Sequence, residues 1–94
     1  AHITGGGLIE NVPRIIPNGL CASIDISTIK VPAIMQEIEK RGNIEHLEMF
    51  GTFNMGVGMV VVVDESLASK VIELVDDAYE IGVITENTEK ISLI

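Results

Sequence analysis

The segment of residues 56–63 constrains the fold more than any other, because five successive residues in it, 59–63, are apolar. A strand with one face in water alternates apolar and polar side chains, and this segment does not. The pattern therefore predicts a strand covered on both faces. The run is far shorter than the roughly 18 apolar residues that a membrane span needs, so no membrane protein is expected.

Three further segments have the composition of strands. Residues 20–26 alternate, with one face formed by Leu20, Ala22, Ile24 and Ile26. Residues 81–85 and 91–94 flank the polar turn 86–90, which predicts a hairpin between them. Together with residues 56–63, these segments predict a sheet of about four strands.

Helical spacing appears in four places. A short helix is expected after Gly7, kinked or ended by Pro13, and a second short turn is expected at residues 44–50. A helix is expected from Pro32 to Arg41, ended by Gly42. It should bury a stripe made of Ile34, Met35 and Ile38. Glu37 and Arg41 lie one turn apart on it. A helix capped by Asp64 or Ser66 should bury a broad apolar face made of Leu67, Ala68, Val71, Ile72, Val75 and Tyr79.

The order of these elements predicts an α+β fold in one domain, residues 1–94, with helices packed on a small mixed sheet. The core should be aliphatic, because 47% of the residues are hydrophobic and only 3% are aromatic. The formal net charge of -8 argues against nucleic acid as a partner. Twelve of the fourteen acidic residues lie between Glu37 and Glu89, so the first twenty residues leave room for a small anion.

The glycine-rich segment of residues 4–7 is the first candidate site. Three successive glycines let a ligand approach the backbone, and the first amides of the following helix have no helical partner. Thr4 can cap that helix, and Arg14 could help to hold a phosphate. The alternative is that the glycines only allow the chain to bend into the helix, and glycine content alone favours this alternative.

The second candidate segment is residues 52–59, where Thr52 and Asn54 precede two glycines, Gly56 and Gly58. Glycine in a strand often marks close approach by a ligand or by another chain. The alternative is a bulge at the glycines with Phe53, Met55 and Met59 in the core. For Asn54 itself, the spacing leaves a turn role and a ligand role equally open.

The remaining reactive side chains give no site. Cys21 is expected to be an inert thiol in a strand, and His46 a surface residue. The two histidines and the single cysteine have no spacing typical of a metal centre, so no metal ligand is expected in this chain.

Together the two glycine-containing segments resemble one family. The first reads His2-Ile3-Thr4-Gly5-Gly6-Gly7-Leu8, continues through Glu10-Asn11 and ends in Pro13-Arg14; the second reads Glu48-Met49-Phe50, then Thr52-Phe53-Asn54-Met55-Gly56-Val57-Gly58-Met59. This pair of motifs is similar to the carboxy-terminal domain of the aminoimidazole ribonucleotide synthetases, the phosphoribosylformylglycinamidine cyclo-ligases. The likeness runs from Ala1 into the last expected helix.

The resemblance implies a cytoplasmic, two-domain enzyme of purine synthesis, of which this chain is the carboxy-terminal part. The absent amino-terminal domain would form the homodimer and bind most of ATP and magnesium. The substrate would be formylglycinamidine ribonucleotide, whose formyl oxygen is phosphorylated by ATP before an amine closes the imidazole ring. Without the amino-terminal domain, the chain should be inactive. The family's carboxy-terminal domain usually begins before the first motif, so the missing upstream strands should leave a sheet edge or an apolar face unprotected, which favours self-association or contact with a second chain that carries the missing part. The alternative is a non-catalytic binding or oligomerisation module of the same superfamily.

The same resemblance implies which residues bind substrate or phosphate, while the catalytic groups stay unassigned. The binding residues are expected to be His2, Thr4, Gly5, Gly6, Gly7, Asn11, Arg14 and Asn54.

Overall fold

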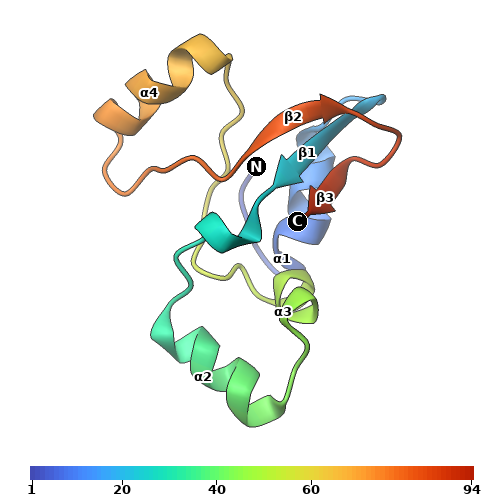
Figure 1. Cartoon of the computed structure of the whole chain (residues 1–94), viewed down its shortest axis with the longest axis vertical. Helices are drawn as coiled ribbons and strands as arrows, with labels where there is room; N and C mark the ends of the chain where they lie inside the picture. Colours follow the sequence, from blue (N-terminus) through green and yellow to red (C-terminus); the bar gives the residue numbers. More distant parts are fainter.

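One three-stranded mixed sheet lies in the upper right part of the view in Figure 1, and its central strand comes first in the sequence. In this computed structural model, which describes residues 1–94, β1 (Leu20–Ile24) lies between β2 (Gly82–Glu86) and β3 (Ile91–Leu93). β1 pairs antiparallel with β2 and parallel with β3. The α+β class is confirmed, with three strands instead of four.

The expected hairpin between the last two strands is wrong. β2 and β3 are joined by the polar turn of residues 87–90, but β1 is inserted between them and takes the hydrogen bonds of both. Ser23 of β1 lies opposite Val83 on one side and Ser92 on the other. Nearness in sequence therefore does not decide the pairing here, because β1 offers both of its edges to the two later strands.

The expectation of a covered strand at residues 56–63 is also wrong. Only one isolated bridge forms there, between Met59 and His2, and the side chains of Met59, Val61 and Val62 are 62%, 63% and 46% exposed. The chain enters the segment through two left-handed residues, Met55 and Gly56, and then continues into α4. An apolar run indicates a need for burial, but no second layer in this chain covers it.

Four α-helices and two 3-10 helices complete the chain. In chain order, they are α1 (Gly7–Asn11), η1 (Val12–Ile15), η2 (Ile26–Thr28), α2 (Ala33–Gly42), α3 (His46–Thr52) and α4 (Glu65–Leu74). α1 ends at Asn11, two residues before Pro13, and the chain continues as η1, in whose first turn a proline needs no amide partner. None of the helices is long and apolar enough to cross a membrane.

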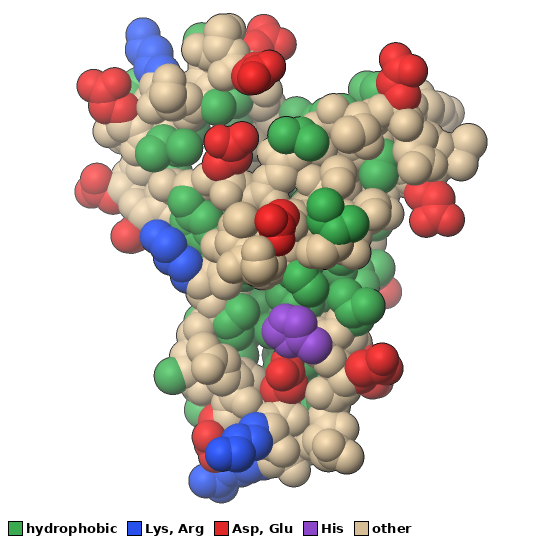
Figure 2. Space-filling view, in the orientation of Figure 1, with side chains coloured by type: hydrophobic (Ala, Val, Ile, Leu, Met, Phe, Trp, Pro, Cys, Tyr) green, Lys and Arg blue, Asp and Glu red, His purple; other side chains and the backbone are tan.

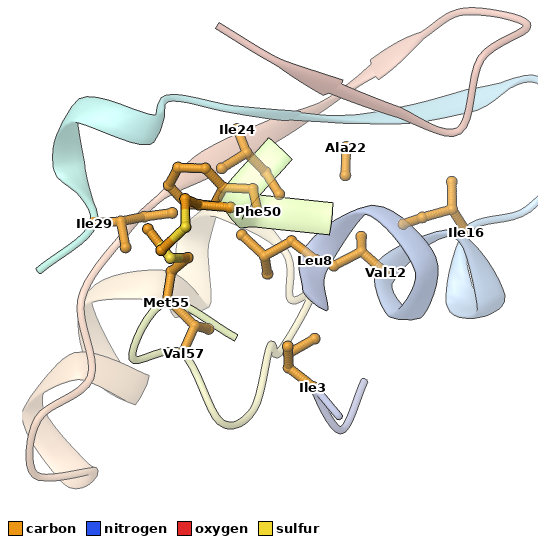
Figure 3. Packing of buried hydrophobic residues seen from close by; sticks show 11 residues of the cluster. Ile3, Leu8, Val12, Ile16, Ala22, Ile24, Ile29, Phe50, Met55 and Val57 are labelled. Carbon is orange, nitrogen blue, oxygen red and sulfur yellow. The ribbon is translucent and has the colours of Figure 1, made fainter. Parts of the chain in front are cut away.

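The core lies between the sheet and the pair α1 and α3 (Figure 3). Figure 3 shows Phe50 of α3 beside Ile24 and Met55, with Leu8 of α1 next to them. Phe50, Leu8 and Met55 are fully buried, and each such side chain contributes about 1.5–3 kcal/mol through burial. This small core fixes α1 and α3 against β1, and so it places both glycine-containing segments.

Both longer helices form where expected, but their predicted apolar faces are not buried. α2 contains no buried residue, and Ile34 and Ile38 are 66% and 37% exposed, while only Met35 packs against the edge of the core. The Glu37–Arg41 ion pair is present at 2.6 Å, and Asn43 rather than Gly42 takes the left-handed position after the helix. Periodicity correctly predicted a helix here, but it could not show whether anything in the chain covers the apolar face.

The predicted apolar face of α4 is also not buried, and the helix ends earlier than expected. Asp64 stands at its amino-terminal cap, without a side-chain hydrogen bond, and the helix stops at Leu74, so Val75 and Tyr79 lie beyond it. The Tyr79 hydroxyl accepts a hydrogen bond from the Lys30 amide at 3.1 Å, which holds the segment after α4 to the chain before α2. In Figure 1, α4 and α2 stand at opposite ends of the molecule, away from the sheet.

We expect this chain to self-associate, because the exposed apolar side chains are concentrated around α4 and the segment before it. Figure 2 shows hydrophobic side chains at the surface over α4, among scattered acidic ones. Leu74, Val61 and Leu67 are 71%, 63% and 47% exposed, and exposed apolar patches of this kind mark interaction surfaces. The sedimentation coefficient should rise with protein concentration, and Leu74→Glu should reduce that rise. A single monomeric species at every concentration would contradict the expectation.

Candidate functional site

The two glycine-containing segments lie side by side, joined by backbone hydrogen bonds. The Ile3 amide donates to the Gly58 carbonyl at 3.0 Å, and the Val60 amide donates to the Ala1 carbonyl at 2.8 Å. These bonds flank the bridge between His2 and Met59, so the backbone of His2 is fixed while its side chain is exposed. Residues almost sixty positions apart in the sequence thus form one surface.

Gly7 joins the glycine loop, residues 4–7, to the end of α3. Its φ of 62° is in the left-handed region, and a Cβ placed on it would collide with the backbone carbonyl oxygens of Phe50 and Phe53. Only glycine permits this close approach, because those oxygens belong to the main chain and cannot rotate away. The contact puts the loop directly beside Phe53, the residue before Asn54.

The buried side chain of Asn11 closes the loop from inside. It is 2% exposed, and its amide nitrogen donates to the carbonyls of Thr4, Gly5 and Gly7 at 3.2, 3.3 and 2.8 Å. The Thr4 hydroxyl donates to the Asn11 side-chain oxygen at 3.2 Å. Asn11 therefore interacts with the loop itself, whereas the family resemblance implied that it binds substrate or phosphate.

The outward side of the loop carries free backbone donors. The amides of Gly5 and Gly6 donate no hydrogen bond within the chain, whereas the Gly7 amide donates to the Thr4 carbonyl at 3.0 Å. A Cβ on Gly5 would have no atom within 4 Å, so the backbone is open there. α1 has only five residues, so its dipole is short, and the unpaired donors at this surface are the loop amides.

Glu10 limits where an anion could bind. A Cβ on Gly6 would meet the Glu10 carboxylate, which therefore lies over the Gly6 side of the loop. A carboxylate at that place repels an approaching anion, so an anion that reaches the Gly5 and Gly6 amides would approach from the Gly5 side. In the first twenty residues Glu10 is balanced by Arg14, and this balance did not indicate that the Glu10 carboxylate lies over Gly6.

Asn54 shapes the second segment through a turn. Its side-chain oxygen accepts a hydrogen bond from the Gly56 amide at 2.8 Å, and its carbonyl accepts one from the Val57 amide at 3.0 Å. Its side-chain nitrogen makes no hydrogen bond within the chain. The oxygen therefore has a turn role, and the nitrogen is free to donate to a ligand. Of the apolar neighbours expected in the core, Met55 is fully buried, whereas Met59 is 62% exposed.

The other sequence candidates lie apart from this arrangement. Arg14 is exposed on η1, and its guanidinium group makes no hydrogen bond or ion pair within the chain. Cys21 is buried in β1, and His46 pairs with Glu39 at 2.6 Å on the surface between α2 and α3. No group of three or more His, Cys, Asp or Glu side chains is arranged to hold a metal ion.

Comparison with known proteins gives a consistent set of relatives. The family described as "AIR synthase related protein, C-terminal domain" matches residues 1–94. A protein of Staphylococcus carnosus named phosphoribosylformylglycinamidine cyclo-ligase is 46% identical over 93 residues, which are 95% of this chain and 27% of the relative. A protein of the same name from Bifidobacterium longum is 49% identical over 92 residues, which are 94% of this chain and 27% of the relative. Another from Oceanobacillus iheyensis is 48% identical over 90 residues, which are 92% of this chain and 26% of the relative.

The chain thus spans about a quarter of the length of these curated relatives. The family match, by contrast, extends over all 94 residues and includes both glycine-containing segments. On that ground the chain belongs to the family of AIR synthase related proteins and represents its C-terminal domain.

Proposed function

We propose that this chain is the carboxy-terminal part of an ATP-dependent cyclo-ligase that converts formylglycinamidine ribonucleotide into aminoimidazole ribonucleotide in purine biosynthesis. The observation that carries the proposal is the contact between the two motifs, where the glycine loop lies against the end of α3 beside Asn54. The name shared by the relatives supports the same activity.

The glycine loop would bind a phosphate group of the substrate or nucleotide. The amides of Gly5 and Gly6 are unpaired donors, and no side chain at Gly5 hinders an approaching oxygen. Successive backbone amides of this kind make an anion-binding concavity. The Thr4 hydroxyl, the His2 side chain and the Gly7 backbone would border the same surface, with Arg14 reaching it only from η1.

Asn54 would donate its free side-chain amide to the substrate from the neighbouring segment. Its oxygen is already held by the Gly56 amide, which fixes the direction of the whole side chain. A side chain oriented in this way loses little further freedom when a ligand binds.

The chemistry itself would take place between this domain and an amino-terminal domain that holds ATP and magnesium and forms a homodimer in the cytoplasm. ATP transfers its γ-phosphoryl group to the formyl oxygen, an amine of the substrate attacks that carbon, and phosphate leaves as the ring closes. Such reactions depend on positioning and on stabilising phosphoryl charge. This domain would contribute the positioning.

We expect the 94-residue chain alone neither to hydrolyse ATP nor to close the imidazole ring. No cluster of carboxylates is present to hold a magnesium ion beside a triphosphate. The measurement is phosphate release and ring formation by the purified chain, compared with the longer polypeptide that includes the amino-terminal domain. Turnover by the chain alone at the rate of the longer enzyme would contradict the proposal that the amino-terminal domain binds ATP and magnesium.

Two substitutions at Asn54 separate its turn role from its ligand role. Asn54→Asp keeps an oxygen that can accept from the Gly56 amide but removes the side-chain donor. In the longer enzyme, it should lower kcat/KM by about 10-fold or more while the thermal midpoint stays close to that of the wild type. Asn54→Ala should lower both quantities. If Asn54→Asp has normal activity, Asn54 is a turn residue only.

A further inference from the structure

Three of the four carbonyl groups of the glycine loop contact one side chain, that of Asn11, while the Gly6 carbonyl accepts from the Glu10 amide. Asn11 is 2% exposed and its nitrogen lies within 3.3 Å of the Thr4, Gly5 and Gly7 carbonyl oxygens. The Thr4 hydroxyl holds the oxygen of the same amide at 3.2 Å, so the amide cannot turn over without losing this set of bonds. An amide has two hydrogens, so these three carbonyls already use its full capacity to donate.

The direction of the carbonyls decides the direction of the amides. In a trans peptide the C=O and the following N–H are coplanar and point opposite ways, and this chain has no cis peptide bond. The Thr4 carbonyl shares its peptide plane with the Gly5 amide, and the Gly5 carbonyl shares its plane with the Gly6 amide. Because Asn11 draws both carbonyls inward, both amides must point outward, and these two donate no bond within the chain.

We propose that Asn11 is a positioning residue, which directs the Gly5 and Gly6 amides at the phosphate group without touching it. The inference rests on the proposed function of the loop. It replaces the expectation that Asn11 itself binds substrate, because the side chain is buried and its donors are already bonded to the loop.

The discriminating variant is Asn11→Asp, which keeps the size of the side chain but removes both donor hydrogens. A carboxylate facing three carbonyl oxygens repels them, so the loop should lose its fixed orientation. The matched control is Cys21→Ala, which alters an equally buried side chain in β1 that takes no part in the loop. Thr4→Val serves as a second variant, because Thr4 is exposed and only its hydroxyl bond to Asn11 is lost.

Two NMR measurements on the 94-residue chain, at concentrations below self-association, test the inference. The first is the backbone order parameter of Gly5 and Gly6, which should fall from about 0.85 to below about 0.6 in Asn11→Asp. The second is a titration with inorganic phosphate, followed at the same two amides. The apparent affinity should weaken at least about 10-fold in Asn11→Asp and stay unchanged in Cys21→Ala.

Each outcome decides a separate question. If Asn11→Asp folds with normal order parameters and normal phosphate affinity, the inference is overturned. If Asn11→Asp does not fold, Thr4→Val decides: increased loop mobility supports the inference, and an unchanged loop overturns it. If the wild-type amides do not respond to phosphate although Asn11→Asp mobilises the loop, the proposed phosphate site fails, while Asn11 stands as the residue that orients the loop.

Discussion

Replacing Gly7 with alanine should lower the free energy of unfolding by about 4 kcal/mol. Two independent effects contribute. The φ of 62° strains any residue with a Cβ, and the added carbon would collide with the backbone carbonyl oxygens of Phe50 and Phe53. Relief would require α1 to move away from α3, and these two helices enclose much of the core.

Urea or thermal unfolding of the Gly7→Ala variant measures this loss. Gly58→Ala is the matched control, because a Cβ at Gly58 would have no atom within 4 Å and its φ is not in the left-handed region. The control should unfold within about 1 kcal/mol of the wild type. Equal stability of the two variants would show that the loop can shift away from α3 at little cost.

Unlike Gly7→Ala, Gly5→Val should greatly weaken the affinity for the phosphate-bearing ligand while the free energy of unfolding changes little. A Cβ at Gly5 would touch nothing within 4 Å, so the side chain fits the free protein. The branched side chain would stand beside the outward amides and block the bound phosphate. In the longer enzyme, the KM for the phosphate-bearing ligand should rise about 10- to 100-fold, as expected when hydrogen bonds to a charged group are lost.

Gly5 is a better position for this test than Gly6. Gly6 has a φ of 92° and the Glu10 carboxylate beside it, so valine there would disturb the fold as well as the site. For Gly5→Val, the thermal midpoint should stay within about 3 °C of the wild type. A lower midpoint combined with normal KM values would mean that the glycines serve only the bend.

Local elements could be predicted where neighbouring residues determine them. The alternation of residues 20–26 corresponds to β1, and the helical spacing after Asp64 corresponds to α4. The Glu37–Arg41 pair follows from one turn of α2. Each of these features depends on contacts within a few residues, and such contacts can be deduced from sequence spacing.

Tertiary relations could not be deduced in this way. The valines of residues 60–63 indicate burial, but burial requires a partner, and only Val60 packs against the core while Val61, Val62 and Val63 are exposed. The strands after Gly82 could pair with each other or with β1, and the pattern of side chains does not distinguish the two arrangements. Strand register and partner choice are non-local, so apolar periodicity alone leaves them open.

The candidate site was predictable in its motifs but only partly in its geometry. The glycine loop and Asn54 stood out in the sequence, yet their adjacency depends on the contact of Gly7 with α3. One feature of the sequence could have indicated that Asn11 bonds to the loop. Asn11 lies four residues after Gly7, so on a helix its side chain is one turn from the Gly7 carbonyl. The position of the Glu10 carboxylate over Gly6 had none.

The most direct test of the phosphate site is a crystal structure of the longer cyclo-ligase with its ribonucleotide substrate and a nucleotide bound. The measured quantity is the distance from the Gly5 and Gly6 amide nitrogens to the nearest phosphate oxygen. We predict about 2.7–3.2 Å for both amides. A complex in which every phosphate oxygen lies beyond about 5 Å from these nitrogens would contradict the assignment of the glycine loop as the phosphate-binding element.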